Sequence, residues 1–309
     1  MKSVSINPLE GKSTKICFLE FTSSIIVELY QLGKIRTAET YNSTLISFKK
    51  FYKRKSLPFN KVDAKLMLSY QNHLIQNGLN MNSISFYNRI LRAVYNRAVA
   101  KNLTKNRQPF KYVYTGVDKT MKRAISLNQI KKIKNFEAIE GSTEDLARDI
   151  FMFSFYTRGM SFIDIAFLQK KDLKDGILTY RRRKTGQILF IRWEPCMENI
   201  IYKYYKQDSQ YMLPIITSDD KDPRRQYLSM AHKINEGLKR IRKSLKLDIP
   251  LTMYVARHSW ASIAQDKNVP LSIISKGMGH DSEETTRIYL NSIDNNRIDK
   301  ANSIILRSL

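Results

Sequence analysis

The chain has 309 residues, and its 53 lysines and arginines outnumber its 28 aspartates and glutamates, so its net charge at pH 7 is +25. A chain of this length usually organises more than one hydrophobic core, which predicts two domains. The positive excess predicts a polyanionic partner, with nucleic acid as the first candidate and a membrane surface as the alternative.

The same sequence excludes or disfavours several other classes of protein. Glu20 and Glu28 interrupt the apolar run at residues 16–32, which excludes a spanning helix there and argues against a signal peptide. We therefore expect a cytoplasmic protein. Cys17 and Cys196 lie far apart without metal-ligand spacing, so the sequence indicates neither a disulfide framework nor a zinc site.

Four amphipathic helices are predicted at residues 13–104, after a short polar tail at residues 1–12. Apolar residues recur at helical spacing in each helix, and Gly33 and Gly78 end the first and the third. Basic residues of the fourth helix lie off its apolar stripe, which makes them candidates for DNA-backbone contacts, with a solvated charged face as the alternative. These residues are Arg89, Arg92, Arg97 and Lys101.

A basic linker is predicted at residues 105–122, between the helical bundle and a second domain. The segment contains Pro109 and Gly116, several lysines and arginines, and little periodicity. A linker with this charge is expected to lie along phosphate groups rather than to swing freely.

The second domain, residues 123–293, is predicted to combine helices with a small antiparallel sheet. Residues 177–183 and 187–193 have the composition of two strands, and the turn Lys184-Thr185-Gly186 joins them as a hairpin. This hairpin also carries Arg181, Arg182 and Arg183. Helices are predicted at residues 126–137, from residue 142 onward, and at residues 198–206 and 225–245.

Polar and charged residues of reactive type cluster at residues 251–290. Arg257 lies at the start of an amphipathic helix, and a second helix follows at residues 271–278. The glycines at 277 and 279 then break the pattern before His280, and a short helix leads to Tyr289. Arginine binds phosphate oxygens bidentately and a tyrosine hydroxyl can attack phosphorus, so this combination predicts chemistry on a phosphodiester.

The residues Arg257-His258, Gly279-His280 and Tyr289 resemble the C-terminal signature of the tyrosine recombinase (phage integrase) family, in which an H-x-x-R-H box precedes a G-H turn and a nucleophilic tyrosine. The resemblance extends over most of the chain. It implies a mainly α fold, with an N-terminal four-helix (SAM-like) core-binding domain and an α+β catalytic domain that together clamp a DNA duplex. It also implies a simple integrase or DNA invertase without an arm-binding domain.

The resemblance implies a role for each candidate catalytic residue. Tyr289 would attack the phosphate and form a 3′-phosphotyrosine, and Lys184 would protonate the departing 5′-oxygen. Arg257 and His280 would neutralise charge on the non-bridging oxygens. No metal and no cofactor is expected, because the covalent bond conserves the energy of the phosphodiester.

The resemblance also implies an assembly on double-stranded DNA. Four protomers on two DNA sites would exchange strands pairwise, whereas the free protein can be a monomer. An amphipathic C-terminal helix at residues 294–309 would be donated to the neighbouring protomer.

The sequence departs from the family pattern at two positions. Tyr254 stands where the box usually has histidine, and a phenol cannot hold a proton reversibly at neutral pH, so a general-base role there is doubtful. Ser161 aligns with the first catalytic arginine, and Arg158 lies three residues earlier. On a helix the two would share a face, so Arg158 is predicted to reach the phosphate, with the hairpin arginines 181–183 as rivals.

Three other functions remain open at this point. A type IB topoisomerase would use the same tyrosine chemistry to relax supercoils. A non-catalytic DNA-binding protein would keep the charge without the reaction, and a basic RNA-binding protein is compatible with composition alone. The sequence does not indicate the target site, or whether the reaction is integration, excision or inversion.

Overall fold

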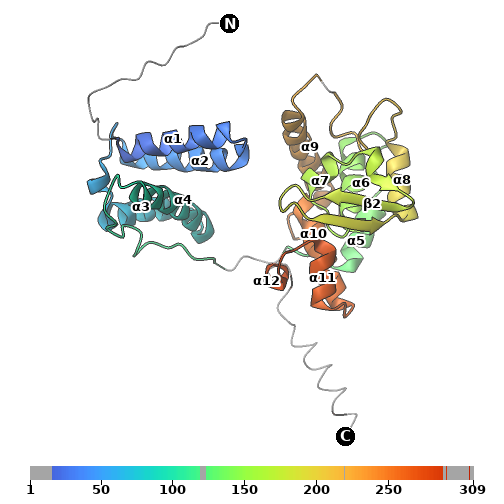
Figure 1. The fold of residues 1–309 in the computed structure, drawn as a ribbon. Coiled ribbons are helices and arrows are strands. Elements are labelled where there is room, and N and C mark those ends of the chain that lie inside the picture. Colours follow the sequence, from blue (N-terminus) through green and yellow to red (C-terminus); the bar gives the residue numbers. More distant parts are fainter. Residues whose placement is uncertain (1–15, 119–122, 219, 288–289, 291–305, 307–309) are drawn as a thin grey trace. The chain divides into compact units, whose positions relative to one another are not determined.

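The computed structural model describes residues 16–118, 123–218, 220–287, 290 and 306 (Figure 1). The chain divides into two compact units, Met1–Thr120 and Met121–Leu309. The tail predicted at residues 1–12 and nearly all of the helix predicted at residues 294–309 lie outside the described residues. Within the described ranges, no helix combines the length and the apolar character that crossing a membrane requires.

The first unit confirms the predicted bundle of four helices, which are joined by short turns and a single 3-10 turn at Phe59–Lys61. Side chains cap the starts of three of these helices, and each cap accepts from one backbone N–H of the first turn. The core is aromatic, with Phe48 packed edge-on against Tyr70 at 5.0 Å. The helices are α1 (Phe18–Gln31), α2 (Ile35–Tyr52), α3 (Ala64–Gln76) and α4 (Met81–Ala100).

The segment predicted as a linker packs largely on this bundle. Phe110 and Val113 are buried in the core of the first unit. The backbone N–H of Tyr114 donates to the side-chain oxygen of Gln71 at 2.6 Å, and the Ser85 hydroxyl donates to the Gly116 carbonyl at 2.6 Å. Residues up to 118 therefore extend the bundle, because two apolar side chains outweigh the basic and turn-forming composition around them.

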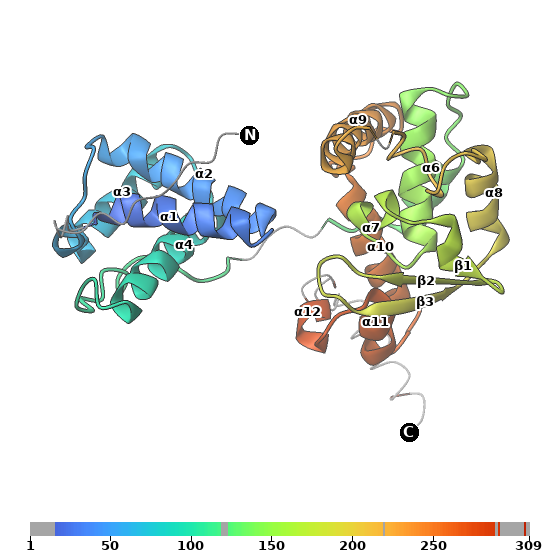
Figure 2. The same cartoon turned by 45° about the horizontal axis from the view of Figure 1, so that its top comes forward.

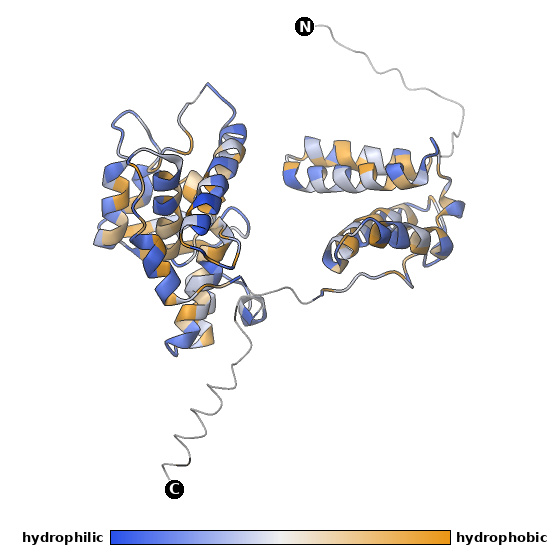
Figure 3. Cartoon of the chain, turned by 180° about the vertical axis from the view of Figure 1, so that it is seen from behind, coloured by the Kyte–Doolittle hydropathy of each residue, from blue (hydrophilic) through white to orange (hydrophobic). Residues whose placement is uncertain are grey.

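The second unit is built around α6 (Thr143–Tyr156), whose buried residues include Ile150, Phe151 and Phe153. Helices α9 (Pro223–Ser244) and α10 (Met253–Asp266) pack beside it (Figures 1 and 2). Gly237 allows the close approach of α9, since a Cβ there would lie 2.7 Å from the Cβ of Ala147. The remaining face of α9 is hydrophilic (Figure 3). The other helices described in this unit are α5 (Leu127–Lys134), α7 (Phe162–Ala166), α8 (Pro195–Lys203), α11 (Leu271–Met278) and α12 (Glu283–Arg287).

The predicted hairpin forms two strands of a three-stranded antiparallel sheet, which confirms the α+β character of this unit. The strands β1 (Leu173–Lys174), β2 (Ile177–Arg181) and β3 (Ile188–Arg192) follow one another in the sheet, and Thr179 pairs with Phe190. Strand β1 was not predicted, because two residues are too few to show an alternating pattern.

An ion-pair network joins α6 to α8. The Lys203 ammonium lies 2.6 Å from Asp145 and 2.7 Å from Asp149, and Arg148 contacts the same two carboxylates. Burial alone would raise the pKa of Asp145, but hydrogen bonds from Lys203 and the Gly141 N–H outweigh it and lower that pKa. Burial alone would lower the pKa of Lys203, but its two hydrogen bonds to the carboxylates raise it.

Replacing Lys203 by methionine is therefore expected to lower the free energy of unfolding by about 2 kcal/mol at neutral pH, because the partly buried carboxylates lose a partner. Because the Asp145 pKa is lowered on folding, its stabilisation is present above the ordinary aspartate pKa and is lost as pH falls through the folded value. Urea unfolding at pH 7 and at acid pH measures both effects. Lys239→Met is the matched control, since the Lys239 side chain is 62% exposed and its ammonium lies 3.7 Å from Glu236.

Candidate active site

Arg257 is a buried cation whose guanidinium contacts two backbone carbonyls and the His280 ring. Its side chain, on the inner side of α10, is 5% exposed. One terminal nitrogen donates to the Gly159 carbonyl at 2.8 Å, and the other donates to the Met278 carbonyl at 2.8 Å and lies 2.8 Å from Nε2 of His280. The structure thus brings together Arg257 and His280, which the sequence predicts to act together.

His280 follows Gly279, which ends α11 in the left-handed conformation at φ 63°. The other ring nitrogen, Nδ1, lies 2.8 Å from the hydroxyl of Thr286 on α12. The pKa of His280 is lowered to about 4, first by burial and then by the positive charges of Arg257, Arg182 and Lys184. In the free protein at neutral pH the ring is therefore neutral, and the positive charge around it comes from lysine and arginine.

The hairpin places Arg182 beside the Gly-His turn. Arg182 is 6% exposed, and its guanidinium donates to the Gly279 carbonyl. A second hydrogen bond also joins the hairpin to the residues after α11. The side-chain amide of Gln187 donates to a carboxylate oxygen of Asp281 at 2.5 Å. Lys184, at the tip of the hairpin, is exposed. The hairpin and the residues that follow α11 therefore form one connected structure.

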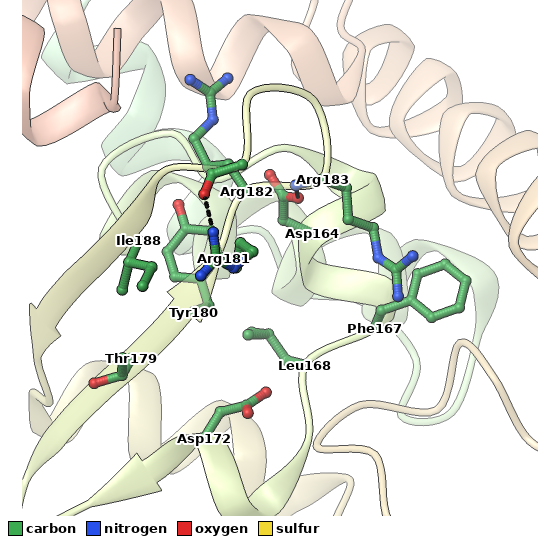
Figure 4. A pocket seen from close by; sticks show the side chains of 11 residues that line it. Asp164, Phe167, Leu168, Asp172, Thr179, Tyr180, Arg181, Arg182, Arg183 and Ile188 are labelled. Atoms are coloured by element: carbon green, nitrogen blue, oxygen red, sulfur yellow. Dashed lines mark hydrogen bonds between the residues drawn. The ribbon is translucent and has the colours of Figure 1, made fainter. Parts of the chain in front are cut away.

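The other two hairpin arginines are exposed and point elsewhere. The Arg183 guanidinium lies 3.7 Å from the centre of the Phe167 ring, and Arg181 donates to the Gly186 carbonyl at 2.7 Å. Figure 4 shows Arg183 over Phe167 and the Arg182 side chain pointing in a different direction. The strand alternation explains this difference, because Leu178 and Tyr180 are buried and Arg182 continues their side of the strand.

The predicted shared helical face of Arg158 and Ser161 is wrong. Helix α6 ends at Tyr156, Arg158 adopts a left-handed conformation at φ 61°, and Ser161 is the residue that precedes α7. The Arg158 guanidinium donates to the Phe190 carbonyl on β3 at 3.3 Å. Ser161 donates to Asp164 at 2.5 Å. The turn that separates the two helices therefore directs these side chains to different partners.

Asp164 connects this turn to the hairpin. One of its carboxylate oxygens accepts from the Ser161 hydroxyl, and the other accepts from the backbone N–H of Arg183 at 2.9 Å. Asp164 is buried, and its bond to Arg183 fixes the residue that precedes Lys184. No spacing signal in the sequence connects Asp164 to the hairpin.

The remaining candidates are distributed over both units. Tyr254 is 45% exposed, and its ring meets the buried His258 ring edge-on at 4.5 Å. Tyr289 lies outside the described residues, and α12 ends two residues before it at Arg287. The four basic residues proposed on α4 are all exposed, in agreement with their position off the apolar stripe: Arg89, Arg92, Arg97 and Lys101.

Gly159 is required by the geometry around Arg257. Its φ is +76°, and a Cβ there would lie 2.7 Å from the Arg257 Cα. Gly159→Ala is therefore expected to cost about 2–4 kcal/mol in stability and to displace Arg257. Gly176→Ala is the matched control, because Gly176 has φ +70° and nothing within 4 Å, which leaves only the cost of the backbone conformation, about 1 kcal/mol. Equal unfolding free energies for the two variants would contradict a steric role.

Two family models match the chain, the phage integrase SAM-like domain over residues 17–115 and the phage integrase family over residues 123–296. These matches, with the fold and the site, define a tyrosine-type site-specific recombinase. The second match spans more than half of the chain, so the chain belongs to the phage integrase family.

The fold is similar to that of several integrases solved with DNA. A lambda integrase dimer bound to a COC′ core site has a TM-score of 0.67 and 16% identity, covering 89% of this chain and 77% of that chain. A lambda integrase tetramer bound to a Holliday junction has a TM-score of 0.70 and 15% identity, with 90% and 78% covered. A Tn1549 transposon integrase with a circular intermediate DNA has a TM-score of 0.69 and 15% identity, with 94% and 99% covered. No curated protein sequence matches this chain.

Proposed function

We propose that this protein cleaves and rejoins double-stranded DNA at specific sites through a covalent 3′-phosphotyrosine at Tyr289, in integration, excision or inversion. One observation carries this proposal. Arg257 and Arg182, both buried, converge with His280 on the segment that precedes Tyr289 in the sequence. Two buried guanidinium groups concentrate positive charge at this place, and a phosphodiester is an anion whose oxygens match their donors.

In the proposed reaction the phenolic oxygen of Tyr289 attacks phosphorus, and the bond from phosphorus to the 5′-oxygen breaks. The phenol loses its proton, and Lys184 gives a proton to the departing 5′-oxygen. Arg257 and Arg182 stabilise the negative charge that develops on the non-bridging oxygens. Attack by the 5′-hydroxyl of another strand reverses these steps and joins the two DNAs.

We assign the role of the missing first arginine to Arg182 rather than to Arg158. Arg182 contacts the carbonyl of the residue before His280, and its charge is one of those that lower the His280 pKa. Arg158 instead donates to the Phe190 carbonyl on β3. Ser161 supports the site indirectly, through its bond to Asp164.

The rest of the chain supports binding and assembly on DNA. The net charge of +25 and the exposed row of Arg89, Arg92, Arg97 and Lys101 suit contacts with phosphate groups. We further propose that four protomers act on two sites and exchange residues 294–309. The support is that lambda integrase has been solved as a dimer on a core site and as a tetramer on a Holliday junction.

The test uses a library of DNA duplexes with randomised sequence. In these duplexes a sulfur atom replaces the bridging 5′-oxygen at each phosphodiester linkage. A 5′-thiolate leaves readily and rejoins poorly, so a cleaving enzyme stays attached to DNA. The protein should yield SDS-resistant complexes on a preferred sequence, and Tyr289→Phe should bind that sequence without forming them. No complex with the unaltered protein, or undiminished complex with Tyr289→Phe, would refute the proposal. Supercoil relaxation without joining of two sites would indicate a topoisomerase instead.

A further inference from the structure

The threonine pair on α12 contains one buried and one exposed hydroxyl. Thr286 is 0% exposed, and its oxygen lies 2.8 Å from Nδ1 of His280. Thr285 is exposed and lies 3.1 Å from the Ser282 hydroxyl. Only Thr286 therefore contacts the candidate site.

A contact on each ring nitrogen of His280 determines where its proton lies. An arginine side chain donates and never accepts, so Nε2, at 2.8 Å from the Arg257 guanidinium, must be the acceptor. A neutral imidazole has one N–H, which is then at Nδ1 and donates to the Thr286 hydroxyl. Thr286 and Arg257 together specify one tautomer of His280.

We infer that Thr286 is a positioning residue, which holds His280 in the Nδ1–H tautomer so that Nε2 can take the proton from the attacking phenol. This inference rests on the proposed function. When a phosphate anion draws the Arg257 donors to its oxygens, the Nε2 lone pair becomes available. The phenolic proton of Tyr289 moves to Nε2 as its oxygen bonds to phosphorus, while Lys184 protonates the 5′-oxygen. The resulting imidazolium keeps its Nδ1–H bond to Thr286.

The other histidines are placed less well for this task. All four are among the described residues, and His73 lies on α3 in the other unit, bonded to Asn77. His232 lies on the exposed side of α9, and His258 is packed against Tyr254. Tyr254 itself is a phenol and does not exchange protons near neutral pH. His280 therefore combines an unprotonated nitrogen with direct contact to Arg257.

The charges around His280 agree with an acceptor role. Arg257 on α10 and Arg182 and Lys184 on the hairpin face the ring, and with burial they lower its pKa to about 4. The nearby Asp281 carboxylate bonds to Gln187. A bound phosphate adds negative charge beside the ring, which raises the pKa toward neutrality, where proton transfer is most effective.

The first test reads the tautomer in the free protein, without DNA. Nitrogen-15 spectra of histidine-labelled protein should show His280, assigned by its loss in His280→Gln, with Nδ1 protonated and Nε2 unprotonated. Thr286→Val removes the acceptor of the Nδ1–H at nearly constant volume, so the Nδ1–H signal should broaden and its proton should exchange with water faster. Thr286→Ser and Thr285→Val should keep the original spectrum. An unchanged Nδ1–H signal in Thr286→Val would overturn the inference.

The second test measures the rate of covalent adduct formation on the DNA selected above. Thr286→Val should be slower by at least about tenfold, the loss expected for a buried hydrogen bond in the site. Thr286→Ser and Thr285→Val should stay within about threefold of the unaltered protein, which separates the hydroxyl from packing. Equal losses of rate in Thr286→Ser and Thr286→Val would overturn the positioning role of the Thr286 hydroxyl. If the unaltered protein forms no adduct, the proposed function fails, and the spectra still decide the tautomer.

Discussion

Replacing Arg257 by alanine is expected to lower the single-turnover rate of adduct formation by about 10³-fold. Removal of one preorganised donor from a site of developing charge typically costs about 10²–10³-fold, and Arg257 also orients His280. The substitution leaves the carbonyls of Gly159 and Met278 without this donor, which should cost about 1–3 kcal/mol of stability for each buried group left unpaired. Adduct rates and urea unfolding of the same preparations measure both effects.

Arg257→Lys separates charge from geometry. Lysine keeps the positive charge but cannot place two nitrogens on the Gly159 and Met278 carbonyls at once. We expect a rate of adduct formation between that of the unaltered protein and that of Arg257→Ala. Full activity in Arg257→Lys would show that the paired backbone contacts are unnecessary, and full activity in Arg257→Ala would remove this residue from the site.

Arg182→Ala is expected to lower the adduct rate by about 10²–10³-fold, whereas Arg158→Ala should remain within about fivefold of the unaltered protein. The physical reason is that Arg182 is buried against the Gly-His turn, whereas Arg158 bonds to a strand carbonyl. Arg183→Ala is the matched control, because it removes an equal charge from the adjacent position, where the side chain stacks on Phe167. Loss of activity in Arg158→Ala with an active Arg182→Ala would reverse the assignment.

The architecture could largely be predicted from the sequence, because each element follows from a local pattern. The helical bundle follows from apolar residues at helical spacing, and the hairpin follows from strand-forming residues around Lys184-Thr185-Gly186. The proximity of Arg257 and His280 was expected from the family resemblance, and the structure has them 2.8 Å apart.

The finer structure of the site depends on features that local patterns do not encode. Arg158 has a positive φ, which non-glycine residues rarely adopt, so a continuous helix was the natural expectation there. The sequence could have predicted which of the three successive arginines is buried. Leu178 and Tyr180 are buried, and Arg182 is the next residue in this alternation. The Thr286 contact with His280 had no such signal, because Thr285 and Thr286 are identical neighbours in the sequence.

The central claim, that Arg257 and Arg182 neutralise the charge of the scissile phosphate, is tested most directly by removing that charge from the DNA. In a methylphosphonate linkage a methyl group replaces one non-bridging oxygen, and the linkage is neutral. Removing an arginine that acts by neutralising charge should then lower the rate of adduct formation by a smaller factor. The rate deficit of Arg182→Ala should therefore shrink by at least about tenfold on the methylphosphonate, while the rates of Arg158→Ala and Arg183→Ala relative to the unaltered protein stay the same. A deficit of equal size on the charged and the neutral linkage would contradict the claim.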